Sequence, residues 1–323
     1  MFAFSLTVFL LALGRALLYG TGRCPDRFEG APKRLSRWMA EVKDQTPLRT
    51  LAIPGAHDAA TKGLPRPGET QHLTVAEQLR SGFRYFDLRV AKPTLPTGSF
   101  RIFHSVMIGR EAEGVLREIR DFLDENPSEC VLLDFQHFKG SEDFLRERIE
   151  ALFGESGRLV ENPGPDSDLE YLRRLTLGEA RGKALVFWGR RQDESLGRFF
   201  LRNDNECTAD GCCLDSYYNG RLHREGTEAL FGQAHPLAFA RLREQAARGT
   251  DCFFVLQCQL TDKYTFRGPW TLERRHASAA SAYIRGLREH PELGRLGIIM
   301  RDFVTPEKAE EILALNEAKG VLK

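Results

Sequence analysis

Six side chains of this protein have types and spacing that suit acid–base chemistry at a phosphate. They are His57, Asp58, Asp87, Arg89, His104 and Asp302. An imidazole titrates near neutral pH, so two histidines can serve as a base and an acid, and each needs a carboxylate that fixes its tautomer. Asp58 and Asp302 are available for this, and the guanidinium of Arg89 is a permanent cation whose fork matches phosphate oxygens. The set indicates in-line displacement at a phosphodiester with no required metal.

Each of these residues also has a structural explanation when it is taken singly. A histidine at a strand end is commonly a structural residue, and Asp87 with Arg89 could form an ordinary buried ion pair. The argument for chemistry therefore depends on whether the fold brings the six together. The strands predicted to carry them cover residues 51–54, 83–90, 101–105 and 297–303. Because Asp87 and Arg89 are two residues apart on one strand, their side chains point to the same side.

Predicted strands alternate with predicted helices along the whole chain, which favours parallel strands with helices outside them. Further strands are expected at 130–135, 184–188 and 252–260, with a weak candidate at 214–218 inside a long irregular stretch. Helices are expected at 32–44, 74–82, 111–125, 141–153, 237–247, 272–288 and 306–318. No GxGxxG or Walker loop follows the first strand, which disfavours an open nucleotide-binding sheet. We therefore predict an α/β fold, a TIM-type (β/α)8 barrel with an irregular stretch, whose active site lies at the C-terminal strand ends.

Composition excludes several classes of partner. The chain has 323 residues, 42% of them hydrophobic, so it can bury a core and is not a disordered protein. Its 46 basic and 45 acidic residues leave no global field that would attract nucleic acid or an anionic membrane. We expect a monomer that binds no nucleic acid.

The N-terminal segment is expected to be a secretory signal. Residues 2–13 are almost entirely apolar, which is too short to span a bilayer but suits the apolar region of a signal peptide. Cleavage after Gly22 would remove residues 1–22 and leave 23–323 as a single barrel domain without a transmembrane span. The protein would then be secreted, or cytoplasmic if this segment is not a signal.

The seven cysteines leave the redox question open. They are Cys24, Cys130, Cys207, Cys212, Cys213, Cys252 and Cys258. An oxidising compartment would allow disulfides near residue 210, and an odd count leaves at least one thiol without an intramolecular partner. No paired C-x-x-C spacing supports a zinc site, so disulfides or inert thiols are the favoured interpretation.

Three segments resemble the phosphatidylinositol-specific phospholipase C X-domain family, in particular the X domain-containing proteins and the small bacterial enzymes. They are the sequence LAIPGAHD at 51–58, the sequence EQLRSGFRYFDLR at 77–89, and Phe103-His104. The likeness extends over roughly residues 45–320, with weaker matches around residues 126–129, 175–183 and 302–303. It implies the same barrel.

The resemblance also implies a role for each residue of the set. His57 would take the proton from the inositol 2-hydroxyl, and His104 would protonate the leaving diacylglycerol oxygen. Arg89 would hold the phosphate oxygens, while Asp58 would orient His104 and Asp302 would orient His57. The first product would be inositol 1,2-cyclic phosphate. Asp87 and Gln136 are expected contacts of the substrate. Trp188, at the end of its predicted strand, could stack on the inositol ring, although core packing is the more common role of such a residue.

Two departures from the family pattern bear on these roles. Ser105 follows the second histidine where many members have glycine. The strand that carries residues 134–136 lacks the basic residue of the bacterial members, which bears on substrate contacts there.

The resemblance implies no cofactor and no metal, because Arg89 stands near the place where the calcium-dependent branch has an acidic ligand. The expected partner is phosphatidylinositol or a glycosylphosphatidylinositol-type lipid at a membrane surface. Aromatic residues in loop-like stretches could form an apolar rim for that contact: Tyr217, Tyr218, Tyr264, Phe266 and Trp270. Two alternatives stay open. One is a metal-dependent phosphodiesterase acting on glycerophosphodiesters or sphingomyelin, and the other is a catalytically weak lipid-binding homologue.

Overall fold

The computed structural model describes residues 28, 30–92, 99–139, 143–164, 167–189, 198–204, 213–261 and 268–323. The expected signal at 1–22 and three cysteines, Cys24, Cys207 and Cys212, lie outside the described residues. Cys130, Cys213, Cys252 and Cys258 are buried. Within the described ranges, no helix combines the length and hydropathy that a bilayer span requires.

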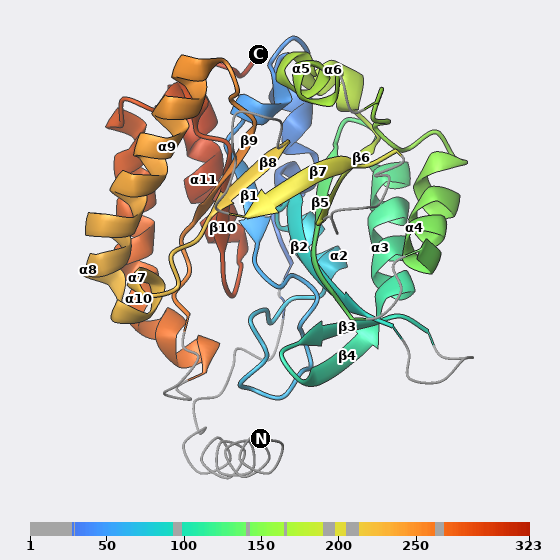
Figure 1. Ribbon diagram of the computed structural model, residues 1–323, viewed down its shortest axis with the longest axis horizontal. Coiled ribbons are helices and arrows are strands. Elements are labelled where there is room, and N and C mark those ends of the chain that lie inside the picture. The colour runs from blue at the N-terminus through green and yellow to red at the C-terminus, as the bar shows by residue number, and fades with distance from the viewer. Residues whose placement is uncertain are drawn as a thin grey trace.

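Eight parallel strands close into a barrel, as predicted (Figure 1). They are β1 (Ile53–Ala56), β2 (Tyr85–Ala91), β5 (Val131–Lys139), β6 (Ala184–Gly189), β7 (Phe200–Asp204), β8 (Leu214–Tyr217), β9 (Phe253–Gln257) and β10 (Ile298–Arg301). Neighbours follow in that order around the barrel, and β1 closes it by pairing with both β10 and β2. All C-terminal strand ends therefore face one end of the barrel.

One predicted barrel strand lies outside the barrel. The segment expected at 101–105 forms β3 (Arg101–His104), which pairs antiparallel with β2 and with β4 (Met107–Glu111). β2 ends at Ala91 and β3 begins at Arg101, so the connection is shorter than the crossover of about a dozen residues that a parallel neighbour needs. The eighth barrel strand is β7, in the stretch expected to be irregular. The apolar run at 199–201 is too short to distinguish a strand from a loop by sequence alone.

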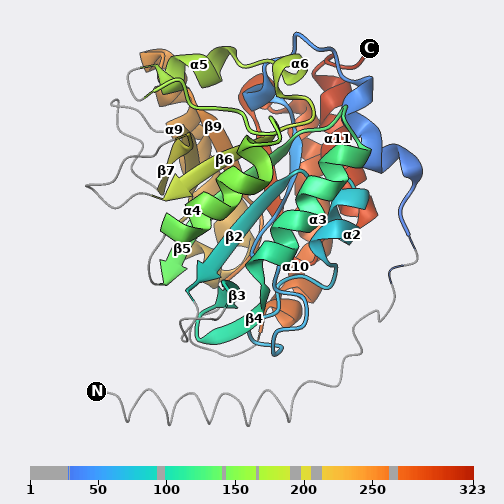
Figure 2. The same cartoon turned by 90° about the vertical axis from the view of Figure 1, so that its right-hand side faces the viewer.

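Helices cover the outside of the barrel. The α-helices are α2 (Val75–Arg80), α3 (Ala112–Glu125), α4 (Asp143–Ile149), α5 (Asp168–Arg174), α6 (Leu177–Ala180), α7 (Leu222–Glu225), α8 (Thr227–Ala229), α9 (His235–Arg248), α10 (Pro269–Gly286) and α11 (Pro306–Ala318). The segment expected as the first helix is the 3-10 helix η1 (Lys33–Glu41). Figure 2 shows α2, α3 and α4 on the side of β2 and β5.

Helix starts follow the local chemistry of the sequence. Thr74 and Glu77 form the predicted capping box of α2, in which each side chain binds the other residue's backbone N–H. Thr305 caps α11 by accepting a hydrogen bond from the backbone of Lys308, and Pro306 occupies the first turn. These caps place the helix starts where the sequence predicts them.

Alternation along the strands divides the apolar core into two layers. Tyr85, Phe187 and Met300 belong to a cluster inside the barrel, whereas Phe86 and Trp188 belong to a cluster beneath the surrounding helices. Residues that follow Tyr85 at intervals of two on β2, namely Asp87 and Arg89, therefore also point inward. The lumen is thus apolar toward the strand starts and polar toward the C-terminal ends.

Candidate active site

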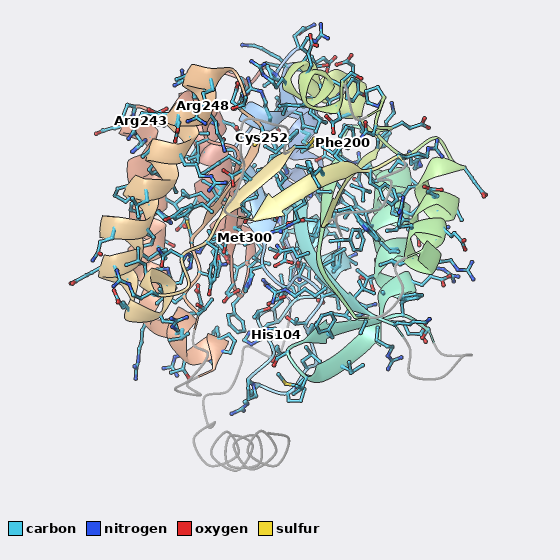
Figure 3. All side chains as sticks on the ribbon, in the orientation of Figure 1. His104, Phe200, Arg243, Arg248, Cys252 and Met300 are labelled. Carbon is cyan, nitrogen blue, oxygen red and sulfur yellow. The ribbon has the colours of Figure 1, made fainter. Side chains whose placement is uncertain are left out.

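The structure brings together the six residues predicted to do chemistry, at the C-terminal ends of β1, β2 and β10. His57 and Asp58 follow β1, Asp302 follows β10, and Asp87 and Arg89 lie on β2. His104 reaches the same place from β3, beside this end of the barrel rather than in its wall. Figure 3 shows His104 at the end where the β3–β4 hairpin lies, away from Met300 and Phe200 in the barrel.

Asp302 contacts His57, the residue that it is expected to orient. Its Nδ1 lies 2.8 Å from Asp302 Oδ1, so Nδ1 carries the proton and Nε2 is left to act as a base. On the other side of the ring, Nε2 lies 3.2 Å from Nη2 of Arg89. A guanidinium can only donate, so this contact fits a neutral imidazole with its lone pair on Nε2.

The surroundings of His57 also stabilise its charged form. Burial alone would lower the pKa of His57, but the negative charges of Asp58 and Asp302 outweigh burial and raise the pKa to about 9. Arg89 opposes this rise. The carboxylates thus stabilise an imidazolium, and these surroundings suit a histidine that takes up a proton.

Arg89 occupies the centre of the cluster. Its Nε lies 2.5 Å from Asp58 Oδ1, and its Nη2 lies 3.4 Å from Asp87 Oδ2. Burial opposes the charge of Arg89, but Asp58 and Asp87 outweigh burial and raise the pKa of the guanidinium, so it stays cationic. Asp87 Oδ2 also accepts a hydrogen bond from the backbone N–H of Asp58, 3.2 Å away, which joins the ends of β1 and β2.

His104 faces the same carboxylate as His57. Its Nδ1 donates to the backbone carbonyl of Gly68 at 2.9 Å, and its Nε2 lies 3.5 Å from Asp58 Oδ2. The Nε2 of His57 is also 3.5 Å from that oxygen. The two nitrogens that could exchange protons with a substrate therefore face one another across Asp58. The His104 side chain is 22% exposed and that of His57 is 11% exposed, so the pair is reached from the barrel mouth.

Backbone strain is concentrated at this site. Among the described residues, the non-glycine residues with positive φ are Asp58 (44°), Ser105 (57°) and Phe303 (44°). Each one is, or directly follows, a residue of the cluster, and strain of this kind is typical of functional sites. The φ of Ser105 gives the physical reason why glycine suits that position, since glycine adopts the left-handed conformation without cost.

A second group of polar side chains adjoins the cluster on β5 and β7, where Asp134 is the register partner of Asp87. Asp134 on β5 is fully buried, and its Oδ1 lies 2.6 Å from Nε of Arg202 on β7. Burial raises the pKa of Asp134 to about 6, although Arg202 opposes this rise. Tyr85 donates to Asp134 at 2.5 Å and Gln136 donates to it at 3.1 Å. Arg202 was not predicted as a site residue, because β7 was not predicted as a strand. Its guanidinium brings a basic group to Asp134, in the stretch 134–136 that has no basic residue of its own.

The structure does not bring Trp188 to the cluster. Its ring is 1% exposed and packs against Phe135 and Phe199 in the cluster beneath the helices. Because residues alternate along β6, Phe187 points into the barrel and Trp188 points away from it. Trp188 therefore takes the core-packing position, whereas Gln136 lies beside the cluster and donates to Asp134, the register partner of Asp87.

The expected aromatic rim is largely packed inward. Tyr217, Tyr218 and Trp270 are partly buried, and Trp270 packs against Phe303 with ring centroids 4.9 Å apart. Tyr264 and Phe266 lie outside the described residues. The exposed large apolar side chains of the β3–β4 hairpin are Val106, 62% exposed, and Ile108, 53% exposed.

Three members of the cluster could share a cation. One ligand atom each from His57, Asp58 and Asp87 lies within 4.8 Å of the others. The guanidinium of Arg89 already contacts both carboxylates, so it supplies a fixed positive charge at the same place. The negative charge of Asp58 and Asp87 is therefore compensated by Arg89 of the chain itself.

Comparisons with known proteins support the resemblance. No protein-family model matches the chain. The 1-phosphatidylinositol phosphodiesterase of Listeria monocytogenes is 31% identical over 159 residues, which cover 46% of this chain and 47% of that protein. The human PI-PLC X domain-containing protein 2 is 32% identical over 186 residues, which cover 47% of this chain and 59% of that protein. The matched region thus spans about half the length of these relatives.

Solved structures of similar proteins share the fold. The phosphatidylinositol-specific phospholipase C from Listeria monocytogenes has a TM-score of 0.64 at 20% identity, with 87% of this chain and 98% of that chain covered. A variant of the Staphylococcus aureus enzyme has a TM-score of 0.66 at 18% identity, with 89% and 99% covered. Sequence and fold together confirm the resemblance to the PI-PLC X domain-containing proteins and the bacterial enzymes.

Proposed function

From this resemblance to the PI-PLC X domain-containing proteins, we propose that the chain is a metal-independent phosphodiesterase. Its proposed substrate is phosphatidylinositol or a glycosylphosphatidylinositol-type lipid, and its proposed products are diacylglycerol and inositol 1,2-cyclic phosphate. The observation that carries the proposal is the placement of His57 and His104, each with Nε2 3.5 Å from Asp58 Oδ2, around the guanidinium of Arg89.

The proposed reaction is a single in-line displacement at phosphorus. His57 Nε2 takes the proton of the inositol 2-hydroxyl as its oxygen forms a bond to phosphorus. The bond from phosphorus to the diacylglycerol oxygen breaks, and that oxygen receives a proton from Nε2 of His104. No water is consumed, and slower hydrolysis of the cyclic product would use the two histidines in reversed roles.

Asp302, Asp58 and Arg89 support these proton transfers in the proposal. Asp302 bonds Nδ1 of His57, which leaves Nε2 free for the substrate and stabilises the imidazolium that forms. Arg89 would hold the phosphate oxygens as their charge builds up in the transition state, which is typically the largest contribution of such a site. To do so it must exchange part of its contact with Asp58 or Asp87 for the phosphate.

The β3–β4 hairpin supports a lipid surface as the partner. Val106 and Ile108 are exposed two and four residues after His104, so an apolar tip adjoins the proposed general acid. Exposed apolar side chains next to a site are typical of binding surfaces. The net charge of +1 gives little overall electrostatic attraction to an anionic membrane. We propose that this tip enters the headgroup region while the lipid headgroup enters the barrel mouth.

The experiment is to incubate the purified protein with phosphatidylinositol vesicles and to follow inositol 1,2-cyclic phosphate by phosphorus NMR, with and without EDTA. We expect the cyclic phosphate to form at the same rate with the chelator, and His57→Ala to abolish its formation. Loss of activity with EDTA would support the metal-dependent alternative instead. Binding of vesicles without any product would support a catalytically weak lipid-binding protein, and unchanged activity of His57→Ala would refute the assigned site.

A further inference from the structure

A fully buried glutamine joins the two strand ends that carry His57 and Asp302. Gln71 is 0% exposed and lies in the loop between β1 and α2. Its Nε2 donates to the backbone carbonyl of His57 at 2.8 Å and to that of Arg301 at 3.2 Å. Its Oε1 accepts from the backbone N–H of Val304 at 3.0 Å. One side chain thus binds the main chain at the end of β1 and on both sides of Asp302.

We propose that Gln71 is a positioning residue, which holds the main chain at His57 and at Asp302 in the relative placement that makes the bond between their side chains. His57 and Asp302 are 245 residues apart in sequence, and their side chains meet at 2.8 Å. The register pairs the two strands up to Ala56 and Arg301, and the backbone N–H of His57 donates to the Arg301 carbonyl at 3.1 Å. Gln71 adds a cross-link beyond this bond, because it also joins the His57 carbonyl to the backbone N–H of Val304.

The chemistry of the primary amide explains why a glutamine is used. The amide offers two N–H donors and one carbonyl acceptor, and the geometry uses both kinds of group in a site closed to water. A glutamate would offer no donor when charged and would place a negative charge against two carbonyl oxygens. A methionine fills similar space without polar atoms, and an asparagine is one methylene too short to reach all three partners.

Neighbouring bonds hold the same loop to the fold, so the loss of one amide need not unfold the protein. The backbone N–H of Phe303 donates to the Thr70 carbonyl at 2.8 Å. On the opposite side, Nζ of Lys308 donates to the carbonyls of Asp302 at 2.8 Å and Phe303 at 2.7 Å. The strained backbone of Phe303 is thereby fixed from two directions, whereas the direct link from this segment to the His57 carbonyl is made by Gln71 and by the weaker 3.3 Å bond from Thr70 Oγ1.

The chain provides a matched control in Gln78. This glutamine is also 0% exposed, and its Nε2 donates to two backbone carbonyls, of Ala59 at 2.6 Å and of Leu73 at 2.8 Å. It has no described bond to β10 or to the residues that follow it. A purely structural role for buried glutamines predicts the same consequences for both, whereas positioning predicts that only Gln71 affects His57.

The test compares Gln71→Met with Gln78→Met by urea unfolding, steady-state kinetics on phosphatidylinositol, and proton NMR titration of His57, whose signal is assigned by its absence in His57→Ala. We expect both variants to lose stability. Only Gln71→Met should lower kcat, by about 10- to 100-fold with KM nearly unchanged, because small misplacements of a catalytic pair have effects of this size. Its His57 should titrate well below the native value of about 9. Gln71→Asn should fall between Gln71→Met and the native protein.

The outcomes distinguish failure of this proposal from failure of the proposed function. The kinetic measurement rests on the proposed function, whereas the titration of His57 does not. Unchanged titration of His57 in a folded Gln71→Met or Gln71→Asn protein would overturn the positioning role. Equal effects of Gln71→Met and Gln78→Met on the His57 titration would overturn it as well. If the native protein forms no cyclic phosphate, the proposed function fails, while the titration of His57 still decides the role of Gln71. Gln71→Asn keeps the test decisive if Gln71→Met does not fold.

Discussion

Replacement of Asp302 by asparagine tests the arrangement around His57 most directly. The carboxylate lies 2.8 Å from Nδ1 of His57 and removes any ambiguity about which ring nitrogen carries the proton. An asparagine keeps the size of the side chain but can present its NH2 group to the ring. Nδ1 would then accept and the proton would move to Nε2, facing Arg89, which cannot accept it. The base would be in the wrong tautomer.

The size of the effect follows from the distance and from the charges. Two unit charges about 4 Å apart interact by about 4 kcal/mol at an effective dielectric constant of about 20, which corresponds to about three pH units. The pKa of His57, about 9 in the native protein, should therefore fall to near its ordinary value in Asp302→Asn. A tautomer error of this kind lowers kcat by roughly 10³- to 10⁴-fold in enzymes whose histidine is held by an aspartate.

The raised pKa of His57 determines the direction in which activity and stability change with pH. The proposed base must be neutral in the free enzyme, so kcat/KM of the native protein should rise with pH until it levels near pH 9. In Asp302→Asn, the rise of kcat/KM with pH should instead be centred near the ordinary pKa of histidine. The folded pKa lies above the unfolded value of about 6.5, so this pairing stabilises the fold fully below pH ~6.5 and is lost as pH rises through about 9. Urea unfolding at pH 6 and pH 10 should show the difference.

The assay combines formation of inositol cyclic phosphate with nitrogen NMR of the imidazole, which reports the tautomer directly. Asp251→Asn is the control. Asp251 is also buried and ion-paired, 2.5 Å from Arg49 and 3.3 Å from Arg173, but it precedes β9, away from the cluster. This control should lose stability and keep kcat and the His57 tautomer. A native kcat and an unchanged tautomer in Asp302→Asn would refute the reasoning.

Three further predictions concern other parts of the site. Arg89→Lys removes the fork that contacts two carboxylates and should lower kcat by about 10²- to 10³-fold in the same assay; less than a fivefold loss would contradict its role at the phosphate. Trp188→Ala should cost about 3 to 5 kcal/mol in urea unfolding because the ring is buried, while KM stays near the native value; a large rise of KM in folded protein would restore Trp188 as a substrate contact. The double variant Val106→Ser with Ile108→Ser should weaken vesicle binding by more than tenfold in sedimentation, with native turnover of a short-chain soluble substrate; equal loss on both substrates would instead indicate damage to the site.

Much of the site was predictable because it depends on short-range rules. Strand alternation places Asp87 and Arg89 on one side, and a position directly after a buried strand places His57 at a barrel end. Alternation does not say which side faces the lumen. Trp188 was therefore a reasonable candidate from sequence, and only the packing of Phe187 inside the barrel assigns Trp188 to the outer layer.

The segments that escaped prediction are those whose partners decide their structure. An extended segment at 101–104 is a barrel strand or a hairpin strand depending on how the chain returns, and β2 takes it as an antiparallel neighbour. β7 has too few apolar residues to predict a strand on its own. It is held by parallel pairing with β6 on one side and with β8 on the other.

The sequence by itself determined the alternating α/β order, the helix caps, and the residue types of an acid–base site around an arginine. Tertiary structure alone decided that His57 and Asp302, 245 residues apart, meet at 2.8 Å, and that both histidines face Asp58. The physical reason is that closure of the barrel sets which strand ends become neighbours. Closure depends on pairings among all strands at once, whereas caps and alternation depend only on residues close together in the chain.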